Sequence, residues 1–116
     1  MTWTLEAVPN VQGDLVAISR FIRQSAIAKG EPRGRAIAMA DTRLEKIAAA
    51  ASALTRAPYQ GTRCPELGPN IRRVTKNRAI FYFDLNEARQ VIRLLAIFFG
   101  GQDHDARILA RLLRPD

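Results

Sequence analysis

The sequence predicts an α+β protein in which a small antiparallel sheet carries an N-terminal helical hairpin, packed on it, and a short C-terminal helix. Three observations predict this class. Residues 61–105 alone alternate apolar and polar side chains between turn residues, as strands do. Residues 14–57 place apolar side chains at helical spacing, with one break at Gly30-Glu31-Pro32. A last short amphipathic segment, residues 106–113, follows the strands.

The first half of the chain predicts one strand and two helices. Residues 2–8 alternate until Pro9, so we expect a strand at the sheet edge or next to it. A helix ending near Lys29 is predicted by apolar residues at helical spacing, which are Leu15, Ile18, Phe21, Ile22 and Ile27. Pro32 suits the opening of a second helix over residues 33–57. Close packing of the pair is favoured by the stripe Ala36, Ala40, Leu44, Ile47, Ala51 and Leu54.

The second half predicts a meander of at least three strands. Its apolar runs are residues 71–76, 78–85 and 90–99. The turns between them are too short for a crossover, so neighbouring strands must be antiparallel. In the middle run Phe81, Phe83 and Leu85 share one face, which we expect to be core. The last run is apolar on both faces except at Arg93, and we expect it to be covered on both sides.

Length and composition bound the function. The 116 residues, 47% of them hydrophobic, predict a single domain over 1–116. No apolar run approaches the roughly 20 residues that span a membrane, and the N-terminus lacks the layout of a signal peptide, so we expect a cytoplasmic protein that binds no membrane. The only cysteine, Cys64, excludes an internal disulfide and is expected to be a passive thiol. With a single His in addition, we expect no metal site and no cofactor.

The chain is strongly basic, and the charge is concentrated. The net charge is +7, and all but three of the 18 basic residues are Arg, which suits carboxylate and phosphate recognition. Residues 63–78 hold five cations against the single anion Glu66, and these cations are Arg63, Arg72, Arg73, Lys76 and Arg78. We interpret this set as a contact surface for a target or for an acidic protein segment. A merely solvated hairpin is the alternative.

The C-terminal segment predicts a helix of about three turns. Asp103 or Asp105 is placed to cap it, after a tight strand exit at Gly100-Gly101. Its narrow apolar stripe consists of Ile108, Leu109, Leu112 and Leu113. The stripe either docks on the sheet or stays partly open to a partner.

This order of elements, with PELGPNIRR leading into the strand IFYF and a last strand ending FFGGQDH, resembles the RelE/ParE superfamily of bacterial type II toxin-antitoxin toxins. The resemblance covers roughly residues 3–113. It implies a small sheet with a helical hairpin packed on it, and a toxin encoded beside a protein antitoxin. Antitoxins of such pairs wrap an extended segment or a helix over the toxin, and we interpret Ile108, Leu109, Leu112 and Leu113 as the antitoxin-binding stripe.

The superfamily divides by target. RelE-like members cut mRNA in the ribosome with Lys and Arg residues on the sheet and a Tyr or His near the C-terminus, whereas ParE-like members poison DNA gyrase. This chain has no Lys pair at the start of the sheet, and Gly100-Gly101-Gln102 stands where the nucleases often have Arg. PELGPNIRR resembles the ParE segment. The resemblance therefore favours a gyrase inhibitor that blocks growth. A RelE-like ribosome-dependent endoribonuclease and a non-toxic antitoxin-binding module remain alternatives.

A nuclease site can nevertheless be assembled from four residues. Arg63 and Arg73 would hold the phosphate, Tyr82 would offer a stacking platform, and His104 would act as acid or base. Such cleavage would be metal-independent. The same residues have structural interpretations, His104 as an early residue of a capped helix and Tyr82 as a strand residue that packs on its neighbours. No residue is therefore assigned as catalytic from the sequence.

Overall fold

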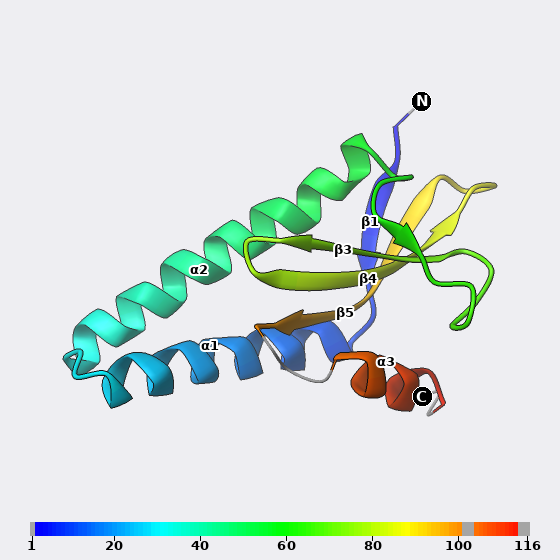
Figure 1. Cartoon of the computed structure of the whole chain (residues 1–116). Coiled ribbons are helices and arrows are strands. Elements are labelled where there is room, and N and C mark those ends of the chain that lie inside the picture. The colour runs from blue at the N-terminus through cyan, green and yellow to red at the C-terminus, as the bar shows by residue number, and fades with distance from the viewer. Residues whose placement is uncertain (1, 101–103, 114–116) are drawn as a thin grey trace.

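The computed structural model describes residues 2–100 and 104–113, and these form a sheet with a helical hairpin on one face and a short helix on the other (Figure 1). The elements in chain order are β1 (Thr4–Ala7), α1 (Asn10–Ala28), α2 (Arg33–Ala53), the 3₁₀ turn η1 (Leu54–Arg56), β2 (Thr62–Arg63), β3 (Ile71–Lys76), β4 (Ala79–Asn86), β5 (Val91–Phe99) and α3 (His104–Leu112). The predicted α+β class is confirmed. Across the part of the chain described, each helix is too short or too polar to cross a membrane.

The sheet has the strand order β1-β5-β4-β3-β2. The meander β3-β4-β5 is antiparallel, as predicted, and its observed strand ends differ from the predicted ones by a residue at most. β1 lies at the edge but runs parallel to β5, which makes the sheet mixed. A parallel pairing is possible because both helices and the rest of the sheet separate these strands in the chain. The two-residue β2 was not predicted, because so short a strand has no detectable alternation.

The turn between β3 and β4 consists of two residues in the left-handed region. Asn77 has φ 53° and Arg78 has φ 64°, the combination of a type I′ turn, whose twist matches that of the flanking strands. Asn tolerates this conformation, but Arg carries a Cβ that disfavours it. Gly61 also has a positive φ, and a Cβ there would overlap the Arg73 carbonyl, so β2 can approach β3 only because residue 61 is glycine.

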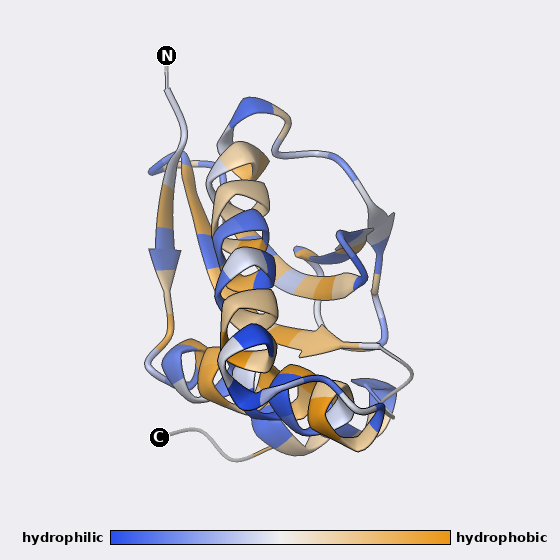
Figure 2. Ribbon diagram, turned by 90° about the vertical axis from the view of Figure 1, so that its left-hand side faces the viewer, coloured by the Kyte–Doolittle hydropathy of each residue, from blue (hydrophilic) through white to orange (hydrophobic). Residues whose placement is uncertain are grey.

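The hairpin-side core lies between α1, α2 and the face of the sheet that the sequence predicted to be buried. Phe81, Phe83 and Leu85 all belong to it. Figure 2 shows mostly apolar residues in the central strands and mixed apolar and polar residues in the helices. From the predicted stripe of α2, Ala36, Ala40, Ile47, Ala51 and Leu54 are buried. α2 itself ends at Ala53 rather than near residue 57, because the chain tightens into η1.

The closed end of the helical hairpin extends beyond the ends of β3, β4 and β5 (Figure 1). Two residues of the predicted α1 stripe, Phe21 and Ile27, are therefore exposed, whereas Ile18 is buried. The helical spacing identified the apolar side chains of α1. It did not indicate how far along the hairpin the sheet reaches.

The α3-side core lies on the opposite face of the sheet. Its buried strand residues include Tyr82, Leu95 and Phe98, and α3 contributes Ile108, which is completely buried. β5 is thus covered on both faces except at Arg93, as predicted. A register irregularity between Tyr82 and Phe83 shifts the pairing from Ala96 to Leu94, so Leu95 is an extra residue in β5.

An ion pair between the buried Asp14 and the partly buried Arg111 joins α3 to α1 across the edge of β5. Pairing of β1 with β5 stops at Leu94, and beyond it Asp14 of α1 accepts a hydrogen bond from the Ile97 amide (3.0 Å). Arg111 of α3 donates to both carboxylate oxygens of Asp14, each at 2.7 Å, and to the Leu95 carbonyl at 3.1 Å. Two side chains therefore satisfy backbone groups that no strand reaches.

Candidate functional site

Four polar side chains meet where α3 begins over the open face of the sheet. Arg73 of β3 lies directly opposite Tyr82 of β4, so the two side chains share the α3 face. His104 and Asp105 form the first turn of α3, above that pair. Three of the four nuclease candidates, Arg73, Tyr82 and His104, are thus brought together, and Asp105 joins them. We call these four residues the Arg73 cluster.

Asp105 is the centre of the cluster. One of its oxygens, Oδ1, lies 3.1 Å from Arg73 Nη1, 3.2 Å from the Tyr82 hydroxyl and 3.3 Å from His104 Nδ1. The shortest contact is between the Tyr82 hydroxyl and His104 Nδ1, at 2.7 Å. Most of the Asp105 side chain faces solvent, and Arg73 is partly exposed, whereas the Tyr82 ring is buried. The cluster is therefore polar at its surface and anchored in the core.

The Tyr82 hydroxyl has one proton and two acceptors in reach, so the cluster has two hydrogen-bonding arrangements. When His104 Nδ1 is unprotonated, Tyr82 donates to it. When Nδ1 carries a proton, His104 donates to the Tyr82 oxygen, and the Tyr82 proton is directed at Asp105. Protonation of His104 Nδ1 thus changes the acceptor of the Tyr82 hydroxyl proton from His104 to Asp105.

Two members of the cluster, Tyr82 and Arg73, have raised pKa values. Burial is the main cause that raises the pKa of Tyr82, with Asp105 adding to the effect and Arg73 opposing it. Tyr82 is therefore a neutral hydrogen-bond donor at neutral pH. The hydrogen bond between Arg73 and Tyr82 is the main cause that raises the pKa of Arg73, so Arg73 stays cationic.

A cavity of about 460 Å³ opens beside the cluster, between the segment that follows β2 and α3. Its walls include Arg73, Tyr82 and Asp105 on the polar side and Leu67, Ile108 and Leu109 on the apolar side. Cys64 also lines it but is almost completely buried, and this burial raises the pKa of its thiol. A protonated, buried thiol is a poor nucleophile.

The other predicted target-binding residues lie elsewhere. Arg63 pairs with Arg72 across β2 and β3, and because facing residues share a side, both lie on the hairpin side of the sheet, opposite to Arg73. Lys76 is opposite Ala79, a hairpin-side core residue. Arg78 lies in the turn at the far end of β3, with its guanidinium 5.8 Å from the Phe99 ring centroid. The five cations therefore form no single patch.

Arg72 contacts its own chain. Its Nη1 donates to the carbonyls of Tyr59, Gln60 and Gly61 at 2.8, 3.5 and 3.5 Å, and its guanidinium lies over the Tyr59 ring. Arg72 thus orders the loop that leads into β2.

The predicted antitoxin-binding stripe of α3 is divided between core and solvent. Ile108 is completely buried against the sheet, and Leu112 packs partly on the same core. Leu109 and Leu113 are exposed. A partner at this surface would therefore contact Leu109 and Leu113, because Ile108 is buried in the core of the chain itself.

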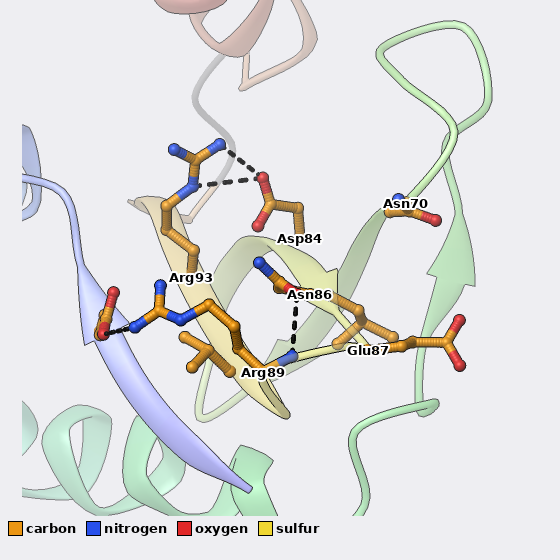
Figure 3. Close-up of a pocket in the computed structure, with 9 residues that line it drawn as sticks. Asn70, Asp84, Asn86, Glu87, Arg89 and Arg93 are labelled. Carbon is orange, nitrogen blue, oxygen red and sulfur yellow. Dashed lines mark hydrogen bonds and ion pairs between the residues drawn. The ribbon is translucent and has the colours of Figure 1, made fainter.

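A second and more polar cavity, of about 590 Å³, occupies the other end of the same sheet face. Figure 3 shows Arg93 directed at Asp84, with both guanidinium contacts made to one carboxylate oxygen at 2.7 and 3.2 Å. Arg89 reaches Glu6 of β1 at 3.5 Å. The charged groups of this cavity are largely paired with one another, which is typical of a cross-strand ladder on a solvated face.

The described residues contain no group of three or more His, Cys, Asp or Glu side chains placed to hold a metal ion. The Arg73 cluster has one imidazole and one carboxylate beside a cation, a combination suited to anions rather than to metals.

Two features of the site had not been predicted as such. Asp105 was expected only as a possible cap, and the pairing of Asp14 with Arg111 was not predicted. The predicted cap Asp103 lies outside the described residues. The alternation of β3 and β4 placed Arg73 and Tyr82 on opposite strands, but contacts across 32 and 97 positions of sequence leave no local pattern.

Comparison with known proteins bears on the fold of the chain. No family model matches the chain, and no curated protein matches it. Among solved structures the fold is similar to a chain from the "Chromosomal ParDE TA system from P. aeruginosa", with a TM-score of 0.62 and 18% sequence identity. The match covers 84% of this chain and 96% of the other. At this identity the likeness concerns the fold alone, and the predicted arrangement, a small sheet with an N-terminal helical hairpin packed on it and a short C-terminal helix, is confirmed.

Proposed function

We propose that this chain is the toxin of a type II toxin-antitoxin module, is neutralised by a cognate antitoxin, and inhibits growth by poisoning DNA gyrase in a ParE-like way. The observation that carries the proposal is the fold shared with a chain of the ParDE system over most of both chains. The ParE-like segment PELGPNIRR and the lack of a Lys pair at the start of the sheet favour gyrase over the ribosome. Poisoning by binding requires no chemistry from the toxin itself.

The edge formed by β2 and β3 is the surface that we assign to the target. Arg63, Arg72 and Lys76 reach it from the hairpin side, and Arg73 reaches it from the α3 side. A partner that approaches the edge can meet both sets, whereas a partner on either face meets only one. β2 pairs only with Arg72 and Arg73, so the last residues of β3 have no strand neighbour at this edge among the described residues.

Ribosome-dependent mRNA cleavage is the second candidate, and the Arg73 cluster favours it. In such a reaction His104 would take the proton of the ribose 2′-hydroxyl, and the 2′-oxygen would attack the phosphorus to form a cyclic phosphate. The bond to the 5′-oxygen breaks in the same step, and that oxygen takes a proton from water. Arg73 and the Tyr82 hydroxyl would stabilise the phosphate charge. Asp105 occupies the position of that anion, so a phosphate would have to displace it.

Inducible expression in a bacterium that lacks the antitoxin tests both candidates. After growth arrest, protein synthesis, mRNA integrity and DNA breaks are measured in parallel for the unmodified chain, Arg73→Ala and His104→Ala. DNA breaks with intact mRNA, and toxicity that survives His104→Ala, would support gyrase poisoning. Cut mRNA and loss of toxicity in both variants would support the nuclease. Normal growth would contradict both and leave a non-toxic antitoxin-binding module.

We also propose that the antitoxin covers the exposed side of α3, next to the Arg73 cluster. Replacing Leu109 and Leu113 by Glu is then expected to weaken binding of the protein encoded beside the toxin by at least about tenfold, because charges enter an apolar contact. Val16→Glu, at an equally exposed position on α1, is the control. Equal affinity of all three proteins in a titration would remove α3 from the interface.

A further inference from the structure

The cavity of about 460 Å³ between α3 and the turn that follows β2 holds charged groups of both signs. Arg73 supplies a cation, and Asp105 and Glu66 supply two carboxylates. The Cys64 thiol lines the same cavity, and its pKa is raised mainly by burial, is lowered by Arg73 and is raised further by Glu66 and Asp105. All three charges therefore lie near one buried thiol, and the cavity combines them within a small space.

These charged groups have capacity left for a ligand. The ion pair between Arg73 and Asp105 uses one guanidinium nitrogen, Nη1, and one carboxylate oxygen, Oδ1, and the two side chains are 41% and 74% exposed. The guanidinium has further N–H donors, and the second oxygen of Asp105 is a further acceptor. Glu66 is exposed, and within the described part of the chain it makes no ion pair. A second carboxylate and an ammonium group can thus bind beside the existing pair.

The other side of the cavity is an apolar wall, which consists of Leu67, Ile108 and Leu109. Ile108 is completely buried, whereas Leu109 is 48% exposed and has apolar surface left to cover. The turn that carries Leu67 is fixed to the sheet. The Leu67 amide donates to the Cys64 carbonyl at 3.0 Å, and the Cys64 amide donates to the Ile71 carbonyl of β3 at 2.9 Å. The apolar wall is therefore formed before any ligand arrives.

We propose that this cavity binds a free α-amino acid with an apolar side chain of about the size of leucine. Its carboxylate would pair with Arg73, its ammonium group would donate to Glu66 and Asp105, and its side chain would cover the apolar wall. A simple carboxylic acid would leave its charge beside two carboxylates, and a simple amine would leave its charge beside Arg73. Only a ligand with both charges and an apolar group complements the whole cavity. This binding does not depend on the toxin activity proposed above.

Three ligands with the same isobutyl group test the proposal. These are leucine, leucinamide, which lacks the carboxylate, and 4-methylpentanoate, which lacks the ammonium group. Each is titrated into the full chain and followed by the amide signals in two-dimensional NMR spectra. We expect leucine to shift the amides of residues 64–67 and 105–109. Both analogues are expected to bind about tenfold more weakly, because each loses a charge-assisted hydrogen bond.

Two variants assign the charges to the two ends of the ligand. Arg73→Gln is expected to weaken leucine and 4-methylpentanoate but not leucinamide, whereas Glu66→Gln is expected to weaken leucine and leucinamide but not 4-methylpentanoate. Arg89→Gln and Glu45→Gln are the controls, since they make the same changes of charge outside this cavity, Arg89 in the other cavity (Figure 3) and Glu45 exposed on α2. The spectrum of each variant without ligand shows whether its fold is kept.

Three results would overturn the proposal. The first is the absence of saturable shifts around the cavity with leucine and also with phenylalanine. The second is an affinity for either analogue equal to that for leucine. The third is a loss of leucine affinity in the controls equal to that in Arg73→Gln and Glu66→Gln. N-acetylleucine that binds as well as leucine would also contradict a free amino acid, and it would assign the cavity to the C-terminal carboxylate of a peptide instead.

Discussion

At the scale of single residues, the site is defined by one exposed carboxylate among three possible donors. Asp105 places one oxygen near Arg73, Tyr82 and His104, in the position that an anionic ligand of the cluster would occupy. The ion pair with Arg73 is exposed, so it contributes at most about 1 kcal/mol to stability. Its main consequence concerns binding, since any phosphate that reaches Arg73 must compete with Asp105.

Asp105→Asn is therefore expected to raise the affinity for a short oligoribonucleotide by roughly tenfold, because it removes the competing charge while nearly keeping the size of the side chain. Fluorescence anisotropy with a labelled oligonucleotide measures the change. Glu66→Gln is the control, because Glu66 lines the same cavity and its replacement also removes one negative charge. An equal gain in both variants would indicate a general charge effect and would argue against competition at Arg73.

Two buried acids make the stability sensitive to alkaline pH. Burial raises the pKa of the Cys64 thiol above its ordinary value of 9.0 and that of Tyr82 above 10.0. A raised pKa in the folded state means that the native chain binds more protons than the unfolded one at high pH. The stabilisation is complete below about pH 9 and is lost as the pH rises through the folded pKa values.

Cys64→Ala is expected to reduce the loss of stability between neutral pH and about pH 10, because the raised pKa of this thiol disappears with it. Urea unfolding at several pH values measures the slope. The variant loses some packing at every pH. The test therefore compares how steeply the free energy of unfolding falls with pH in the two proteins, and not its absolute value. An unchanged slope would assign the alkaline sensitivity to other groups, Tyr82 among them.

At the scale of elements, the hairpin of β3 and β4 combines a suitable turn residue with an unsuitable one. Asn77 accepts a positive φ, but Arg78 adopts φ 64° with a full side chain. The left-handed conformation costs such a residue roughly 1–2 kcal/mol. The contact of Arg78 with the Phe99 ring recovers part of that cost.

Arg78→Gly is therefore expected to change the free energy of unfolding by less than about 1 kcal/mol, because relief of the turn offsets the lost contact with Phe99. Thermal or urea unfolding measures it. Arg78→Ala is the matched variant, since it loses the same contact but keeps the Cβ, and it is expected to be clearly less stable than Arg78→Gly. Equal stability of the two would mean that the positive φ carries no measurable strain.

At the scale of the whole molecule, α3 is held to the sheet by polar contacts at both ends and by one completely buried residue between them. Asp105 and His104 hold its first turn to β3 and β4. Arg111 holds its last turn to Asp14 of α1 and to the edge of β5. Ile108 is the only completely buried residue of this helix as described. The ion pair thus joins α1, β5 and α3 in one network.

Asp14→Ala is expected to destabilise the fold by about 3 kcal/mol or more, since it leaves Arg111 and the Ile97 amide without their buried acceptor. Urea unfolding measures the loss, and amide exchange is expected to be faster in α3 than in β4. The double variant Asp14→Ala, Arg111→Met is expected to be more stable than Asp14→Ala alone, because an apolar side chain at position 111 does not depend on the Asp14 carboxylate. If the losses in free energy of unfolding caused by Asp14→Ala and by Arg111→Met simply add in the double variant, the two side chains act independently.

The sequence by itself determined the elements and the faces of the strands. Hydrophobic periodicity and turn residues are local properties, so they were sufficient for the helical hairpin, for the antiparallel meander and for placing Phe81 and Tyr82 on opposite sides of β4. The same alternation separated Arg72 from Arg73. The parallel pairing of β1, and the two-residue β2, depend on partners far along the chain and had no local signal.

The tertiary structure decided which of the basic residues act together. Five cations that are close in sequence were dispersed to both faces and both ends of β3, because a strand alternates its side chains and extends them over its whole length. The Arg73 cluster and the Asp14–Arg111 pair instead combine residues from separate elements. Packing of whole elements brings such residues together, and no periodicity in the sequence encodes it.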